Sequence, residues 1–301
     1  MQIKANGIDI EVETFGDKND PAIIFVMGFG AQLIQWPVEL MEGLAARGFH
    51  VLRFDNRDVG LSQKFPELGM PDVSEVLGKI LAGEDPKVPY TLTDMAADAV
   101  GVLDTLGIDK AHIAGGSMGG MIVQVAAAGW PDRFKSMTSI FSTTGNLELP
   151  QASEEAMTAL LSRPANEERE TVIEHSIGVR KAIGSPAYPA PDDEAREKAA
   201  ESFDRSYYPE GTTRQYAAIV ADGDRRDRIK TISCPVLVLH GTDDPLVRVE
   251  GGRDTAANIS GARMVEIAGW GHDMPKELMV RLVDEIGNHC ASAEGRAQAA
   301  E

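Results

Sequence analysis

The apolar positions of the chain fall into short continuous runs, separated by segments in which apolar residues recur at helical spacing. Continuous runs are typical of strands covered on both faces, and the chain has six of them: Ala22–Val26, His50–Phe54, His112–Ala114, Ser136–Phe141, Val236–His240 and Met264–Ile267. Asn6-Gly7 favours a tight turn between two further strands, Gln2–Ala5 and Ile8–Phe15. Helices are predicted over Pro37–Arg47, Thr93–Leu106, Met118–Trp130 and Pro275–His289. This alternation predicts an α/β fold with a mostly parallel, eight-stranded sheet and helices on both of its faces.

Two segments interrupt the alternation. Residues 148–228 contain no strand pattern, only charged helical stretches over Ser153–Ser162, Glu167–Ile183 and Asp192–Phe203. We expect residues 148–228 to form a helical cap inserted into a core of residues 1–147 and 229–290. A shorter insertion, Gln63–Tyr90, is rich in glycine and proline and contains a predicted helix over Asp72–Leu81. The small, polar residues 291–301 are expected to fray.

Composition narrows the classes of function. The chain has 301 residues, of which 43% are hydrophobic, and this is ample material for a buried core. Its 47 acidic and 29 basic residues give a net charge of −18, and such a surface repels nucleic-acid phosphates and anionic lipids. No apolar run approaches the roughly 20 residues of a membrane helix, and two cysteines form neither a disulfide framework nor a zinc quartet. We therefore expect a soluble, cytoplasmic protein, a monomer or homodimer, with no metal and no nucleic-acid or membrane partner.

The segment most informative about chemistry is Gly115-Gly116-Ser117-Met118-Gly119, which matches the pattern G-x-S-x-G. It lies directly after a predicted strand and directly before a predicted helix. A nucleophilic serine needs this placement, because a sharp strand-to-helix turn exposes its hydroxyl at a helix N-terminus that favours negative charge. Read alone, the string also fits a glycine-rich turn with an N-cap serine. The prediction that Ser117 is a nucleophile therefore depends on its partners.

A serine nucleophile needs a base, and the base needs a carboxylate that orients it. Among six histidines, His272 stands out in a glycine-rich loop between the last predicted strand and the last predicted helix. The loop after Val236–His240 carries two adjacent acids, Asp243 and Asp244, and spacing alone does not decide between them. The order serine, acid, histidine is the one expected of hydrolases with this serine turn. The alternative for His272 is a solvated loop histidine without a catalytic role. The alternative for the two aspartates is a turn in which their side chains cap backbone N–H groups.

Acyl transfer also needs N–H donors for the oxygen that becomes negative. The backbone N–H of Met118, immediately after the serine, is one predicted donor, and that of Phe29 in the turn after Ala22–Val26 is the other. An ordinary strand-end turn is the alternative for the second. The predicted substrate-pocket residues are Gly28, Trp36 and Trp270. The two tryptophans fit equally well as packing between loops.

The oxyanion turn and the motifs G-x-S-x-G, G-x-x-D and G-x-G-H together resemble the α/β-hydrolase superfamily in order and spacing. Three stretches are similar to the branch that contains aclacinomycin methylesterase and related bacterial carboxylesterases: VMGFG with Trp36, FDNRDVGLS and GGSMGG. The resemblance extends over Ile8 to His289 and is weakest in the predicted cap. It implies an α/β-hydrolase fold with an inserted cap and a carboxylesterase that cleaves small to medium esters through an acyl-enzyme, without cofactor or metal.

Carried onto this chain, the resemblance implies Ser117 as nucleophile, Asp244 as acid and His272 as base, with oxyanion donors at Phe29 and Met118. The family's D-x-R-G-x-G-x-S segment, a brace beside the oxyanion turn, maps onto Asp55, Arg57, Gly60 and Ser62. Two positions depart from the family pattern. Asp58 stands where a glycine is usual, and Met27 stands where a histidine is common, so any contribution of that histidine's side chain is absent.

Other reactions use the same triad, and they stay open as alternatives: prolyl aminopeptidase, perhydrolase and C–C bond hydrolase. A non-catalytic ligand receptor is less favoured, because all three triad positions are filled. Dehalogenases and epoxide hydrolases of this fold place an aspartate where Ser117 stands, which argues against both. The sequence does not decide the natural substrate.

Overall fold

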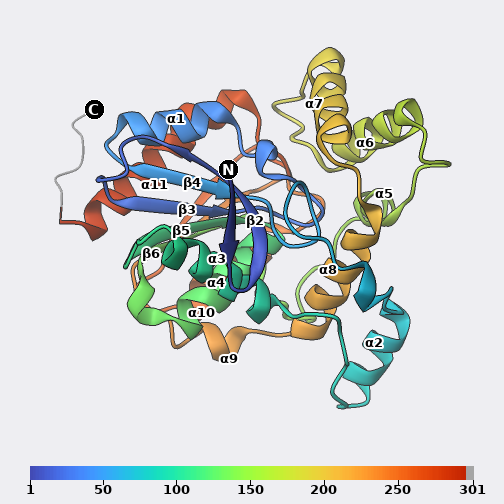
Figure 1. The fold of residues 1–301 in the computed structure, drawn as a ribbon, viewed down its shortest axis with the longest axis horizontal. Coiled ribbons are helices and arrows are strands. Elements are labelled where there is room, and N and C mark those ends of the chain that lie inside the picture. The colour runs from blue at the N-terminus through green and yellow to red at the C-terminus, as the bar shows by residue number, and fades with distance from the viewer. Residues whose placement is uncertain (296–301) are drawn as a thin grey trace.

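The computed structural model describes residues 1–295, in which eight strands form one sheet. The strands lie in the order β1-β2-β4-β3-β5-β6-β7-β8 (Figure 1). Only the pairings of β2 with β1 and with β4 are antiparallel, which confirms the mostly parallel sheet predicted from the sequence. Their bounds are β1 Gln2–Ala5, β2 Ile8–Phe15, β3 Ala22–Val26, β4 His50–Phe54, β5 Ala111–Gly116, β6 Phe134–Ile140, β7 Val236–Gly241 and β8 Arg263–Ile267.

Helices cover both faces of the sheet, so successive residues of a central strand enter different cores. In β3, Ile23 and Phe25 pack toward α1 and α11, whereas Ile24 and Val26 pack toward α3 and α4. This two-sided burial explains why the central strands are continuous apolar runs. Figure 1 shows α1 and α11 on one side of the sheet and α3, α4 and α10 on the other. The bounds are α1 Val38–Ala46, α3 Leu92–Thr105, α4 Met118–Gly129, α10 Val249–Asn258 and α11 Met279–Ala293.

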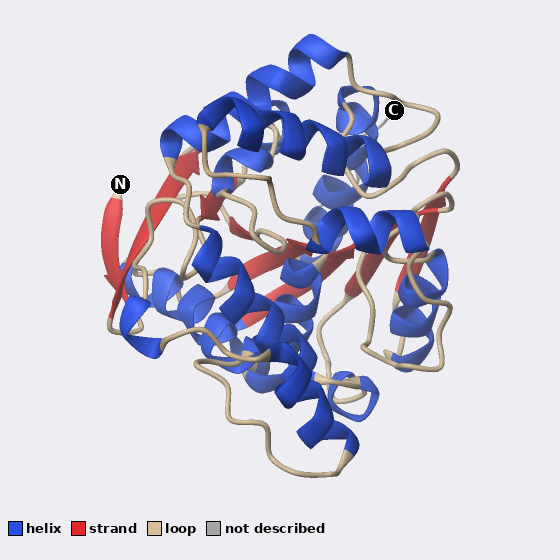
Figure 2. Cartoon of the chain, turned by 90° about the vertical axis from the view of Figure 1, so that its right-hand side faces the viewer, coloured by secondary structure: helices blue, strands red, loops and turns tan. Residues whose placement is uncertain are grey.

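The segment between β6 and β7 is helical, and its helices lie beside the sheet in Figure 1. Figure 2 is turned so that they face the viewer, with the strands behind them. Helices α6 and α7 have a small apolar core of their own, made by Ile173, Ile177, Ala195 and Ala199. The shorter insertion contributes α2, which packs against α8. The bounds are α2 Val73–Leu81, α5 Glu154–Leu161, α6 Arg169–Ile183, α7 Asp192–Arg205, α8 Pro209–Asp222 and α9 Arg226–Ile229.

The C-terminal segment expected to fray is ordered over its first residues. Helix α11 continues to Ala293, and the carboxylate of Glu294 accepts a hydrogen bond from Lys135 Nζ at 2.6 Å. The same carboxylate lies 3.1 Å from Nε2 of the buried His112. These contacts attach the end of α11 to the edge of the core. Residues 296–301 of the predicted tail lie outside the described part of the chain.

Candidate active site

Ser117 lies at the junction of β5 and α4, in a backbone conformation with φ +56° and ψ −120°. This is a strained conformation for a residue with a side chain. The turn is so tight that a Cβ atom on Gly119 would lie 2.0 Å from the carbonyl oxygen of Val26. A Cβ atom on Gly115 would lie 2.2 Å from the carbonyl oxygen of Gly119. Glycine is therefore required at both ends of the G-x-S-x-G motif, for the packing reason that a serine turn of this type predicts.

The structure brings Ser117, His272 and Asp244 together. His272 Nε2 lies 2.9 Å from Ser117 Oγ, and His272 Nδ1 lies 2.7 Å from Asp244 Oδ2. The second oxygen of the Asp244 carboxylate accepts hydrogen bonds from the N–H groups of Leu246 and Val247, at 2.9 and 2.8 Å. These bonds fix the carboxylate, which is 1% exposed, in the orientation that faces the imidazole.

The neighbouring Asp243 points elsewhere. Its exposed carboxylate accepts hydrogen bonds from the hydroxyl of Thr242 at 2.6 Å and from the N–H of Gly269 at 2.8 Å. The Thr242 hydroxyl is the larger cause that lowers the pKa of Asp243. Of the two acids that the sequence leaves open, Asp244 is therefore the one in contact with His272.

A second histidine lies beneath the acid loop. His240 is fully buried at the end of β7; its Nε2 lies 2.7 Å from the carbonyl oxygen of Val247 and 3.7 Å from Asp244 Oδ2. Burial lowers the pKa of His240, which favours the neutral imidazole. Its contact with Val247 holds the turn whose N–H groups orient Asp244. This role was not predicted from the sequence, which shows only a histidine at the end of the strand Val236–His240.

The turn after β3 lies directly against Ser117. A Cβ atom on Gly28 would lie 3.2 Å from Ser117 Cβ, so the backbone passes close to the hydroxyl. Among residues 1–295, no acceptor receives a hydrogen bond from the N–H of Phe29 or of Met118. Met118 is the first residue of α4, and N–H groups in the first turn of a helix have no partner within the helix. Both N–H groups are therefore without an acceptor in the described chain, and both belong to residues that border Ser117.

Side chains from two segments hold this turn in place. Asn56 Nδ2 donates to the carbonyl oxygen of Met27 at 2.8 Å. Gln215 of α8 accepts the N–H of Gly30 at 2.9 Å and donates to the carbonyl oxygen of Arg57, also at 2.9 Å. Gln215 is fully buried, so these bonds are shielded from water. Phe29 therefore lies between two residues, Met27 and Gly30, whose backbone groups are held by these side chains.

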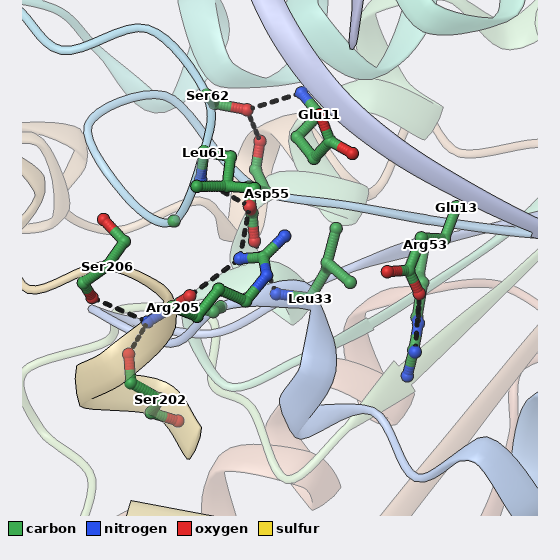
Figure 3. Close-up of polar contacts among 12 residues, drawn as sticks. Glu11, Glu13, Leu33, Arg53, Asp55, Leu61, Ser62, Ser202, Arg205 and Ser206 are labelled. Carbon is green, nitrogen blue, oxygen red and sulfur yellow. Dashed lines mark hydrogen bonds and ion pairs between the residues drawn. The ribbon is translucent and has the colours of Figure 1, made fainter. Parts of the chain in front are cut away.

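Asp55 is the centre of the brace expected beside the turn (Figure 3). Its fully buried carboxylate accepts hydrogen bonds from the N–H of Leu33 at 2.7 Å, the N–H of Leu61 at 2.8 Å and Arg205 Nη1 at 2.7 Å. Ser62 donates to the carbonyl oxygen of Asp55 at 2.6 Å. Burial raises the pKa of Asp55, while these donors oppose that shift. Because Arg205 belongs to α7, the brace also joins the core to the segment between β6 and β7.

Asp58, which replaces the family's glycine, forms a second connection of this kind. Its φ of +67° lies in the region that glycine adopts freely and that aspartate tolerates better than most residues. Its carboxylate pairs with Arg214 of α8 through Nε at 2.8 Å and Nη2 at 2.9 Å, and both side chains are buried. Arg214 also donates to Tyr208 Oη and to the carbonyl oxygen of Gly69, each at 2.9 Å. The hydrogen bonds with Asp58 raise the pKa of Arg214.

A cavity of about 270 Å³ opens at the serine and is lined by Ser117, His272, Gly28, Phe29 and Trp36, among others. Trp270, predicted as a pocket residue, does not line it. Its ring is fully buried, packs edge-on against Phe141 at 5.4 Å between centroids, and donates its indole N–H to the carbonyl oxygen of Asp273 at 2.7 Å. Trp270 instead packs behind the loop that carries His272.

A second cavity of about 460 Å³ lies next to the first and shares Phe29, Leu160 and Ser176 with it. Its other walls come mainly from α5 to α8 and include the tyrosines Tyr207, Tyr208 and Tyr216. None of these tyrosines was predicted, because aromatic residues in a charged helical stretch carry no signal that they line a cavity.

Three further observations concern the described residues. No group of three or more His, Cys, Asp or Glu side chains in residues 1–295 is arranged to hold a metal ion. Burial raises the pKa of Cys234 to about 11 and that of Cys290 to about 12, so both thiols are protonated near neutral pH. No helix in the same range is long and apolar enough to cross a membrane.

Comparison with known proteins identifies the class. A family model of the alpha/beta hydrolase fold matches residues 21–277, and the chain therefore belongs to the α/β-hydrolase family. It is similar to rhodomycin D methylesterase DauP of a Streptomyces species, at 25% identity over 93% of this chain and 94% of the relative. It is also similar to 3-oxoadipate enol-lactonase 2 of Acinetobacter baylyi, at 25% identity over 85% of this chain and 84% of the relative. The resemblance inferred from the motifs is confirmed.

A solved structure agrees with this assignment of the fold. The enol-lactonase from Burkholderia xenovorans aligns with a TM-score of 0.70 and 22% identity, over 98% of this chain and 100% of that one. At this identity the alignment establishes the shared fold, and the chemistry has to be argued from the site.

Proposed function

We propose that the protein is a serine carboxylic-ester hydrolase that acts through an acyl-enzyme. The observation that carries the proposal is the contact of Ser117 Oγ with His272 Nε2 at 2.9 Å and of His272 Nδ1 with Asp244 at 2.7 Å. A serine hydroxyl is a weak nucleophile until a neighbouring base takes its proton. A buried carboxylate on the far nitrogen keeps the imidazole in the required tautomer and stabilises the imidazolium that forms.

In the proposed reaction, Ser117 Oγ attacks the ester carbonyl carbon while its proton passes to His272 Nε2. The N–H groups of Phe29 and Met118 stabilise the negative oxygen of the tetrahedral intermediate. The intermediate collapses, the C–O bond to the alcohol breaks, and His272 returns the proton to the leaving oxygen. His272 then takes a proton from water, whose oxygen attacks the acyl carbon. The bond from that carbon to Ser117 Oγ breaks, His272 returns the proton to Ser117 Oγ, and the acid is released.

The relatives and the cavity support the choice of esters. A methylesterase and an enol-lactonase, as their names say, both open a bond between an acyl carbon and an ester oxygen. The cavity of about 270 Å³ supports small to medium esters as substrates. Leu160, Ser176 and Ile183 enter its wall from α5 and α6, and this supports a division into a hydrolase core and a cap of residues 148–228.

The test is hydrolysis of p-nitrophenyl esters, from acetate to dodecanoate, by the wild type and by Ser117→Ala. Ser74→Ala, at an exposed serine of α2, is the matched control. We expect activity on short chains that Ser117→Ala abolishes and Ser74→Ala retains. Absence of wild-type activity on every chain length would refute the ester function, and prolyl amides, peroxide-dependent oxidation and C–C cleavage substrates would then be assayed.

A further inference from the structure

A cation from the segment between β6 and β7 lies in the wall of the serine cavity. Arg180, in the last turn of α6, lines the same cavity as Ser117 and His272 and is partly buried. Its Nη2 donates to the amide oxygen of Gln35 at 2.9 Å. Among residues 1–295, no carboxylate forms an ion pair with this guanidinium. Arg180 is therefore a charged side chain whose one polar partner in the described chain is neutral.

The two acids whose charges act on Arg180, Asp273 and Glu194, form no ion pair with it. The carboxylate of Asp273, also in the cavity wall, accepts a hydrogen bond from the Ser185 hydroxyl, and burial raises its pKa. Glu194 pairs with Lys198 at 2.9 Å and with Lys276 at 3.6 Å. Burial in turn lowers the pKa of Arg180, because its charge is withdrawn from water without a counter-ion in contact. An arginine remains protonated in such a setting and retains N–H donors that have no acceptor.

The surroundings strengthen any charge interaction with Arg180. Ile34, Trp36, Val179 and Ile183 line the same cavity as Arg180, and electrostatic attraction is stronger where apolar side chains exclude water. This positive charge is notable in a chain whose net charge is −18, since the surface as a whole repels anions. A cation held among apolar side chains beside a nucleophilic serine fits a ligand with an apolar stem and an anionic end.

We propose that Arg180 binds a carboxylate of the substrate, and that the protein prefers half-esters, in which a free carboxylate lies a few carbons from the scissile ester. This inference rests on the ester-hydrolase function proposed above and specifies its substrate class. A guanidinium and a carboxylate form paired, charge-assisted hydrogen bonds that fix orientation as well as affinity. A cavity of about 270 Å³ corresponds to roughly nine water molecules. That volume suits a short dicarboxylate chain.

The test compares monomethyl and dimethyl esters of succinate, glutarate and adipate, which differ in the free carboxylate. Arg180→Met keeps an unbranched apolar stem and removes the charge, and Arg180→Lys restores the charge without the planar fork. We expect Arg180→Met to lower kcat/KM for the monomethyl esters by about 10- to 100-fold, mainly through KM. The dimethyl esters and p-nitrophenyl acetate should change little, and Arg180→Lys should recover part of the loss. Lys181→Met, at the exposed cation next to Arg180 on α6, is the control and should leave the preference unchanged.

A binding measurement separates this inference from the proposed function. Calorimetric titration of glutarate into Ser117→Ala should show binding that the double variant Ser117→Ala with Arg180→Met loses. A protein that hydrolyses p-nitrophenyl acetate but shows neither the half-ester preference nor this binding would overturn the inference alone. Equal losses on monomethyl and dimethyl esters in Arg180→Met would also overturn it, because they indicate a structural role. No activity on any ester would refute the proposed function and the inference with it.

Discussion

Replacing Asp58 by asparagine removes one charge from a buried ion pair and puts an amide NH₂ group in place of one carboxylate oxygen. Asparagine keeps the shape of the side chain and, like aspartate, tolerates the positive φ of +67° at this position. Arg214 would stay buried, with the amide oxygen, Tyr208 Oη and the carbonyl oxygen of Gly69 as its neutral acceptors. Removing one member of a buried pair costs about 3–5 kcal/mol, because the other charge is left uncompensated. Since these neutral acceptors remain, we expect the lower end, about 3 kcal/mol.

Equilibrium unfolding in urea, followed by circular dichroism, measures this cost. With a slope of roughly 3 kcal/mol per molar urea, a loss of about 3 kcal/mol lowers the midpoint by about 1 M. Asp204→Asn, which breaks the exposed pair with Arg169, is the control and should leave the midpoint unchanged. Asp58→Asn combined with Arg214→Met removes both charges and should be more stable than the sum of the single variants predicts. The reasoning is refuted if Asp58→Asn behaves like Asp204→Asn, or if the two substitutions are simply additive.

Three further predictions concern the site and the core. Asp244→Asn should lower kcat by roughly ten-thousand-fold, because His272 loses the carboxylate that orients it, whereas Asp243→Asn should retain activity. Gln215→Leu removes the acceptor of the Gly30 N–H and should lower kcat by up to about 100-fold with little change in KM, because it displaces an oxyanion donor. Burial lowers the pKa of His289 to about 4, whereas a histidine in the unfolded chain has a pKa near 6.5. Between these two pH values the unfolded chain therefore binds a proton that the folded chain does not bind. The contribution of His289 to the free energy of unfolding is therefore complete above pH 6.5 and falls by about 3 kcal/mol as the pH drops to 4. His289→Gln should remove this contribution to the loss of stability in acid.

These outcomes can each fail in a defined way. Equal losses in Asp243→Asn and Asp244→Asn, assayed with p-nitrophenyl acetate, would contradict the assignment of the acid. A rise in KM alone for Gln215→Leu would mean that it supports substrate binding and not the oxyanion donors. Urea midpoints between pH 7.5 and 4 test the last prediction. If His289→Gln and the half-buried control His175→Gln depend on pH in the same way as the wild type, His289 is not the group responsible.

The sheet and the serine turn were predictable because local packing alone determines them. A strand such as Ala22–Val26 has both faces covered, so it must be apolar throughout, and that run is visible without any partner. The glycines beside Ser117 are likewise required by contacts within the turn and its neighbouring strand. Spacing alone did not predict the choice between Asp243 and Asp244, for which only the family resemblance favoured Asp244. The choice depends on which carboxylate the N–H groups of Leu246 and Val247 hold, and adjacent residues of a turn have no periodicity that reveals this.

The features that the sequence did not predict depend on partners distant in the chain. Helix α8 was not assigned, because its buried polar residues Arg214 and Gln215 look like a solvated surface until Asp58 and Gly30 are placed beside them. The same holds for Arg180, whose position in the cavity wall follows from how α6 packs over the core. The prediction that Trp270 lines the pocket was wrong for a related reason. A tryptophan beside a catalytic loop can face either side of it, and here it faces the core.

Labelling with a fluorophosphonate, followed by peptide mass spectrometry, tests most directly whether Ser117 is an activated nucleophile. The reagent transfers its phosphonyl group to a serine whose proton a neighbouring base removes, so it reports on the contact between Ser117 and His272 at 2.9 Å. The account predicts a single adduct on the peptide that contains Ser117, its absence in Ser117→Ala, and strongly slowed labelling in His272→Ala. A folded wild-type protein that takes up no label, or takes it up at another serine, would contradict the account.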